Sequence, residues 1–270
     1  MPVIIELRLR APGRDYVPKP AQLHGLACSL FEGVSYDGHA GQEKPFSVWP
    51  LVSVEDGWLL RAAWLGAGIP RAALAACGEL RVGPVFCTVS DVALRPVSFG
   101  DLASSPACEG ARLEFRSPAY FSSNGERLVA PDPRLIVGSW RRRWNASVGA
   151  VGDLAMGDEG WLCLYRALRL AEFDLRTVKQ DSGYGRSQPG FTGKATLRFA
   201  RGTSAEARSR FGTLARFAEF CGTGAQTTHG FGATTVTLLP LSRPPTPVGP
   251  RESAGQRLTP PEEGISGPGS

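Results

Sequence analysis

The order in which the spacing of apolar residues changes along the chain limits the possible folds more than any other feature. Residues 3–10 alternate apolar and polar side chains, which is typical of a strand with one buried face. Residues 22–32 place apolar side chains at helical spacing. A hairpin around Asp56-Gly57, a short helix and a strand follow, predicted at residues 46–52 and 58–65, 70–77, and 80–94.

The second half repeats this order of elements without repeating the sequence. Strands are predicted at residues 112–116, 167–179, 191–199 and 233–239, and helices at residues 132–144 and 203–221. Asp132 before Pro133 is typical of a helix start, and Thr203 with Glu206 predicts a capping box. The order strand, helix, strand, strand, helix, strand defines the split βαβ unit. We therefore predict an α+β fold of two tandem ferredoxin-like (RRM-like, βαββαβ) domains, at residues 1–108 and 109–241.

Composition favours an acidic partner. Thirty Lys and Arg give the chain a net charge of +5, and guanidinium groups bind phosphate oxygens in a bidentate manner. The same charge could serve solubility alone. Residues 242–270 are rich in Pro, Gly, Ser and charge with few apolar side chains, so we predict a disordered tail.

Cysteine spacing and the N-terminal residues indicate a cytoplasmic protein. The six cysteines contain no C-x-x-C pair, which argues against a zinc ribbon or a thioredoxin-type motif and predicts reduced thiols. The first ten residues carry charge where a signal peptide needs an apolar run, and no stretch approaches the roughly 18 apolar residues of a membrane span. No membrane association is expected.

A glycine-dense segment, CGTGAQTTHGFGAT, lies between the last predicted helix and the last predicted strand, at residues 221–234. Its glycines let a backbone approach a ligand closely and turn N–H groups toward phosphate oxygens. They are Gly222, Gly224, Gly230 and Gly232. The segment lacks the Lys-Ser/Thr ending of a P-loop and follows a helix, so neither a P-loop nor a Rossmann fingerprint fits. A loop that only closes a helix-to-strand connection is the simpler alternative.

Three segments together carry a family resemblance. They are the glycine loop, LEFRSPAYFSSNGERLVAPDPRLIVGSWRRRWN at residues 113–145, and PGFTGKATLRF at residues 189–199. In this order they resemble the CRISPR-associated RNA-processing endoribonucleases, well over residues 113–239 and more loosely before them. The resemblance implies binding of CRISPR repeat RNA, in precursor CRISPR RNA, and contact with other subunits of a CRISPR effector complex. It also implies cleavage without metal or other cofactor, by 2′-OH attack that leaves a 2′,3′-cyclic phosphate and a 5′-OH.

Such a reaction needs a base, an acid and a cation that stabilises charge on the phosphate. The chain has three histidines, His24, His39 and His229. His39, in a segment that resembles the variable first-domain segment of the family, is predicted to be a general acid or base. His24 on the first predicted helix is predicted to be its partner, with Tyr36 as a weaker substitute, and Lys44 is predicted to stabilise the transition state. A solvated loop histidine, a half-buried helix histidine and an ordinary exposed lysine are the alternatives.

The RNA-binding residues are predicted in two places. His229 and the four loop glycines are expected to contact RNA rather than catalyse. Arg141, Arg142 and Arg143, between Trp140 and Trp144, are expected to contact phosphates, although they could form a merely solvated face. The tryptophans are expected in the core. A non-catalytic RNA-binding subunit of an effector complex is the competing interpretation, favoured if His24 and His39 do not converge, whereas an unrelated small-molecule enzyme lacks a matching acidic or metal-binding constellation.

Overall fold

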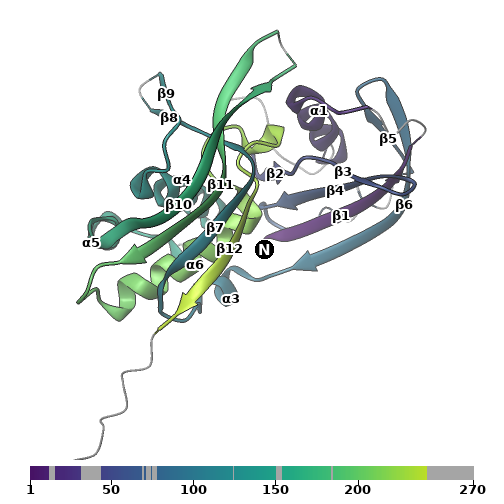
Figure 1. The fold of residues 1–270 in the computed structure, drawn as a ribbon. Helices are drawn as coiled ribbons and strands as arrows, with labels where there is room; N and C mark the ends of the chain where they lie inside the picture. The colour runs from purple at the N-terminus through teal and green to yellow at the C-terminus, as the bar shows by residue number, and fades with distance from the viewer. Residues whose placement is uncertain are drawn as a thin grey trace, which may run out of the picture.

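Two antiparallel sheets, one from each half of the chain, form the fold (Figure 1). The computed structural model describes residues 1–11, 16–31, 44–68, 70, 74, 78–123, 125–149, 154–183 and 185–241. The predicted tail at 242–270 lies outside these ranges. The prediction of an α+β fold with tandem ferredoxin-like units is confirmed, because both sheets have the corresponding strand order.

The first sheet has the strand order β2-β4-β1-β6-β5, with β3 paired to β4. Its elements are β1 (Val3–Arg10), α1 (Pro20–Phe31), β2 (Phe46–Val48), β3 (Val52–Val54), β4 (Gly57–Trp64), β5 (Glu79–Val82), β6 (Val85–Pro96) and the short helix α3 (Phe99–Ala103). The run predicted as one strand at 46–52 is divided into β2 and β3 around Pro50, which has no N–H to donate to a sheet. The run predicted at 80–94 is a hairpin, since Gly83 turns the chain at a φ of 61°.

The second sheet has the order β10-β11-β7-β12. This half of the chain contains β7 (Cys108–Ala119), β8 (Phe121–Ser123), β9 (Glu126–Leu128), α4 (Pro133–Val148), α5 (Asp158–Ala167), β10 (Leu168–Asp181), β11 (Ser187–Phe199), α6 (Ala205–Cys221), the 3-10 turn η2 (Thr227–His229) and β12 (Thr234–Pro240). The strands β8 and β9 form a separate two-stranded sheet. The Asp132 side chain caps α4 by accepting from the Arg134 N–H at 2.7 Å. The cap of α6 is one residue later than predicted, because Ser204 rather than Thr203 accepts from the Ala207 N–H.

Some elements were not predicted from the sequence, and one predicted helix lies mostly outside the described residues. The amphipathic helix α5, the β8–β9 hairpin and α3 were not predicted. Of the helix predicted at 70–77, only Pro70 and Leu74 are described, and the Leu74 N–H donates to the Pro70 carbonyl at 3.1 Å as in a helix. The five described cysteines are free. No helix in the described part of the chain combines the length and the apolar composition that a membrane crossing requires.

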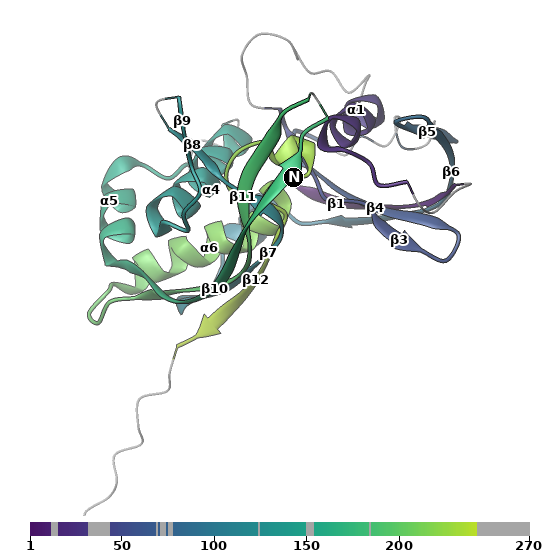
Figure 2. The same ribbon diagram turned by 45° about the horizontal axis from the view of Figure 1, so that its top comes forward.

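The two halves share apolar packing and hydrogen bonds. Ile4, Ala63 and Leu65 of the first half belong to the same buried cluster as the second-half residues Trp140 and Phe217. The division into domains at residue 108 stays a prediction. Figure 2 shows α6 running from the second sheet toward the first, with the turn before β12 beside α1.

Polar contacts fix the same junction. The Ser47 hydroxyl of β2 donates to the Phe220 carbonyl at 2.5 Å, and the Arg143 guanidinium of α4 donates to the Phe46 carbonyl at 2.8 Å. These contacts bring the end of α6, and the glycine loop that follows it, against α1 and β2.

Candidate active site

His24 is held by the glycine loop from the other half of the chain. Its ring Nδ1 lies 3.0 Å from the carbonyl oxygen of Thr228. Because a carbonyl oxygen only accepts, Nδ1 carries the proton, and the lone pair of the neutral ring is at Nε2. The helix α1 supplies the histidine and the turn η2 supplies the carbonyl, so the orientation of the ring depends on the packing of one half against the other.

Lys44 faces the lone pair of His24. Its Nζ lies 3.0 Å from His24 Nε2 and 3.3 Å from the sulfur of Cys28, to which it donates. The Cys28 sulfur is itself 3.6 Å from His24 Nε2. Burial lowers the pKa of His24, the charge of Lys44 lowers it further, and the bond to Thr228 opposes both effects. The site therefore combines a neutral imidazole with an adjacent ammonium group.

His229 stacks on His24. The two ring centroids are 3.9 Å apart and the ring planes are only 8° from parallel. The Thr228 hydroxyl lies 3.0 Å from His229 Nδ1, so one residue contacts both histidines. Burial, followed by the proximity of His24 and Lys44, lowers the pKa of His229 to about 4. Both imidazoles are consequently neutral near pH 7.

The glycine loop is built by contacts within the protein. All four glycines have a positive φ, and three of their N–H groups donate to protein acceptors: Gly222 to Ala218 O at 2.8 Å, Gly224 to Ser139 Oγ at 3.1 Å and Gly232 to Pro118 O at 2.9 Å. These three N–H groups therefore do not point at a ligand, which differs from the expectation that the loop turns its N–H groups toward phosphate. At Gly230 a Cβ would lie 2.9 Å from Leu23 Cδ1, so the missing side chain lets the loop approach α1 next to His24.

The three consecutive arginines have different surroundings. Arg141 donates to the Met156 carbonyl and to Asp158, and its guanidinium lies 5.5 Å from the Trp161 ring centroid. Arg143 binds the Phe46 carbonyl, whereas Arg142 is exposed. Trp140 and Trp144 are fully buried, as expected. Arg142 is thus the most exposed of the three side chains.

The structure brings together His24, Lys44 and His229 from three separate parts of the sequence. Cys28 joins them and was not predicted, although its position four residues after His24 places it on the same helix face. His39 and Tyr36 lie outside the described residues. Within the described ranges no three His, Cys, Asp or Glu side chains gather as a possible metal site.

We expect the folded protein to lose stability as the pH falls from about 6.5 to about 4, because an unfolded histidine titrates near 6.5 whereas His229 resists protonation. In this window the unfolded chain binds a proton that the folded chain does not, and His24 acts in the same direction. Urea unfolding at several pH values measures the loss. The variant His229→Phe keeps a stacked ring without titrating, so its loss should be smaller; an equal loss would remove His229 from this explanation.

Fold and site together define a protein of the tandem ferredoxin-like class with a histidine–lysine site at the junction of its halves. The model of the family CRISPR-associated endoribonuclease Cas6 matches residues 113–234. Two solved Cas6 product complexes align with 88% of this chain: one at 30% identity and a TM-score of 0.75 over 99% of its own length, the other at 25% and 0.73 over 100%. Thermus thermophilus Cas6 aligns at 29% identity and a TM-score of 0.70, over 88% of this chain and 98% of its own.

Two curated relatives give a shorter match. CRISPR-associated endoribonucleases Cas6 from two strains of Mycobacterium tuberculosis are 34% identical over 135 residues, which are 50% of this chain and 41% of each relative. The matched part thus spans less than half the length of these curated relatives. The chain belongs to the CRISPR-associated endoribonuclease Cas6 family.

Proposed function

We propose that the chain is an endoribonuclease that binds CRISPR repeat RNA and cleaves precursor CRISPR RNA without a metal ion. The observation that carries the proposal is the contact between His24 Nε2 and Lys44 Nζ. The opposite ring nitrogen of His24, Nδ1, is held by the Thr228 carbonyl oxygen. A neutral imidazole can accept a proton near pH 7 once Lys44 leaves its lone pair, and the ammonium group beside it can then stabilise an oxyanion. Cleavage by a ribose 2′-OH requires both groups, the proton acceptor and the cation.

In the proposed reaction His24 Nε2 accepts the proton of the 2′-OH. The 2′ oxygen attacks the adjacent phosphorus, and Lys44 exchanges its contact with His24 for one with a non-bridging phosphate oxygen. The bond from phosphorus to the 5′ oxygen then breaks, giving a 2′,3′-cyclic phosphate and a 5′-OH. We assign the acid that protonates the 5′ oxygen to His39, five residues before Lys44 in the sequence.

In this reaction His229 holds His24 in position and does not contact the reacting atoms of the RNA. It covers one face of the His24 ring at 3.9 Å and shares Thr228 with it. The glycine loop therefore acts partly as a support that fixes the tautomer and orientation of the base. This role adds to the RNA contacts expected of the loop.

The proposal is tested with purified protein and labelled repeat RNA in excess EDTA. Cleavage should persist in EDTA, should fail on RNA with a 2′-deoxy substitution at the scissile nucleotide, and should fall sharply in a His39→Ala variant. Loss of cleavage in EDTA that Mg²⁺ restores would contradict the metal-independent mechanism. Tight binding without cleavage of any RNA would instead favour a non-catalytic RNA-binding subunit of an effector complex.

A further inference from the structure

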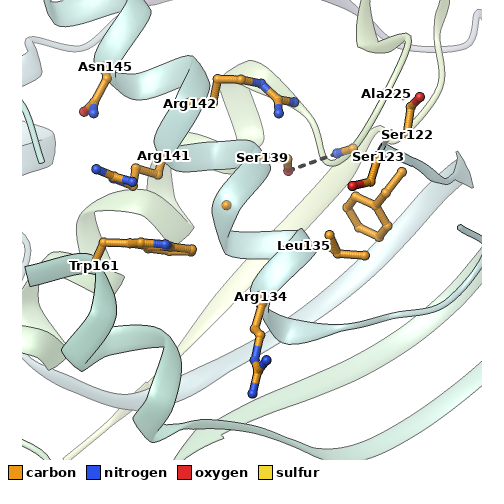
Figure 3. Close-up of a pocket in the computed structure, with 13 residues that line it drawn as sticks. Ser122, Ser123, Arg134, Leu135, Ser139, Arg141, Arg142, Asn145, Trp161 and Ala225 are labelled. Carbon is orange, nitrogen blue, oxygen red and sulfur yellow. Dashed lines mark hydrogen bonds between the residues drawn. The ribbon is translucent and has the colours of Figure 1, made fainter. Parts of the chain in front are cut away.

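A cavity of about 540 Å³ opens between α4, α5, β8 and the glycine loop (Figure 3). Gly224 and Ala225 of the loop line it, whereas Thr228 and His229 of the same loop contact His24. The five residues from Ala225 to His229 are joined by four residue-to-residue steps, which span at most ~14 Å. At a rise of ~3.4 Å per stacked nucleotide, this corresponds to about four nucleotides. A strand of RNA at His24 can therefore reach the cavity.

The wall of this cavity is basic. Arg134, Arg141 and Arg142 contribute to it, and the described residues that line it include no Asp or Glu. Arg141 is already bound to Asp158 and to a backbone carbonyl, so its charge is largely compensated. Arg134, which lies over the Tyr165 ring, and Arg142 are exposed. The cavity thus presents two exposed guanidinium groups, which favours an anionic ligand with phosphate groups.

The positions of these two arginines distinguish a small anion from a polyanion. Arg134 and Arg142 are eight residues apart on α4, or ~12 Å along the helix axis. Figure 3 shows Arg142 at the end nearer the glycine loop and Arg134 at the other end of the cavity. The neighbouring Arg143 binds the Phe46 carbonyl of β2, so the Arg142 end of α4 is also the end nearer Lys44. The two side chains also point in different directions (Figure 3), so in this arrangement one phosphate ion meets only one of the two guanidinium groups.

We propose that Arg142 and Arg134 form a phosphate track along α4 that binds unpaired nucleotides of the repeat RNA beyond the scissile site. The strand passes from His24 across the glycine loop, and its phosphates meet Arg142 first and Arg134 later. The inference rests on the proposed function because it takes repeat RNA as the ligand. It adds a binding subsite and the order in which the strand meets its two arginines.

The test uses repeat RNA with a 2′-deoxy scissile nucleotide, so that binding is measured without cleavage. Arg142→Ala and Arg134→Ala are each expected to weaken binding roughly tenfold at low salt, as loss of a charge-assisted hydrogen bond does. Each should also reduce the slope of log K against log salt concentration by about 0.7. The matched control is Arg201→Ala, because Arg201 is an exposed arginine of the turn before α6, at the far end of that helix from the glycine loop.

Shortening the RNA tests the order of the contacts. As nucleotides are removed from the end that lies in the track, the effect of Arg134→Ala should disappear first and that of Arg142→Ala next. Affinities and salt slopes of both variants equal to those of Arg201→Ala would overturn the track. Equal sensitivity of both variants at every RNA length would overturn the proposed path. Since the RNA is not cleaved, failure here leaves the EDTA-resistant cleavage assay unaffected, and failure of that assay leaves this result interpretable.

Discussion

Replacing His24 by glutamine is expected to lower the single-turnover rate of repeat RNA cleavage by about 10²–10⁴-fold, the usual contribution of a general base or acid. A glutamine amide can still donate to the Thr228 carbonyl, but it cannot accept a proton from the 2′-OH near pH 7. The affinity for 2′-deoxy repeat RNA should change little, because the substitution retains a polar side chain of similar length. Rates at saturating protein and binding curves measured in parallel separate the two effects.

The pH profile gives this prediction a second readout. Burial and Lys44 lower the pKa of His24, so the base is neutral above about pH 6.5 and loses its lone pair to a proton as the pH falls below its pKa. The wild-type rate should therefore decline on the acid side, and the residual rate of His24→Gln should lack this decline. A variant that cleaves within threefold of wild type and keeps the acid decline would exclude His24 as the base and leave His39 as the candidate.

Strongly periodic and well-capped elements could be predicted from the sequence alone. The helix α4 was predicted because Asp132 and Pro133 mark its start and its buried tryptophans lie one turn apart. The helix α5 was not predicted, since Leu164 is its one fully buried residue and its other apolar side chains pack only partly. Hairpins could not be located where a turn interrupts a continuous apolar run, as at Gly83, because the apolar pattern is the same on both sides of the turn.

The chemistry of the candidate site could be predicted better than its geometry. The sequence predicts His24 and Lys44 because few residue types can act as a base or a cation, and the structure places the two side chains in contact. The stacking of His229 on His24 joins residues 205 positions apart and depends on how the two halves pack, which no local pattern encodes. Cys28 cannot be predicted as part of the site in the same way, because a lone thiol carries no motif and only its helical spacing from His24 points to it.

Substituting Gly232 by alanine should destabilise the protein more than the same change at Gly202. Both glycines have a positive φ, 64° and 78°, so alanine is strained at either site. At Gly202 a Cβ would meet no atom within 4 Å, whereas at Gly232 it would lie 1.9 Å from the Thr223 carbonyl oxygen. Strain alone costs about 1–2 kcal/mol, and overpacking against fixed backbone adds about 1–3 kcal/mol at Gly232.

Urea unfolding of Gly232→Ala and Gly202→Ala measures both costs on the same scale. The Gly232 N–H donates to Pro118, and its carbonyl accepts from the Thr223 N–H at 2.8 Å, so any backbone shift that relieves the clash disturbs the base of the loop. That shift should also move Thr228 relative to His24 and lower the cleavage rate of the folded fraction, an effect not expected for Gly202→Ala. Equal destabilisation by the two substitutions would mean that the glycine loop needs only backbone freedom. A larger loss at Gly232 together with slower cleavage would show that close packing of the loop holds His24 in place.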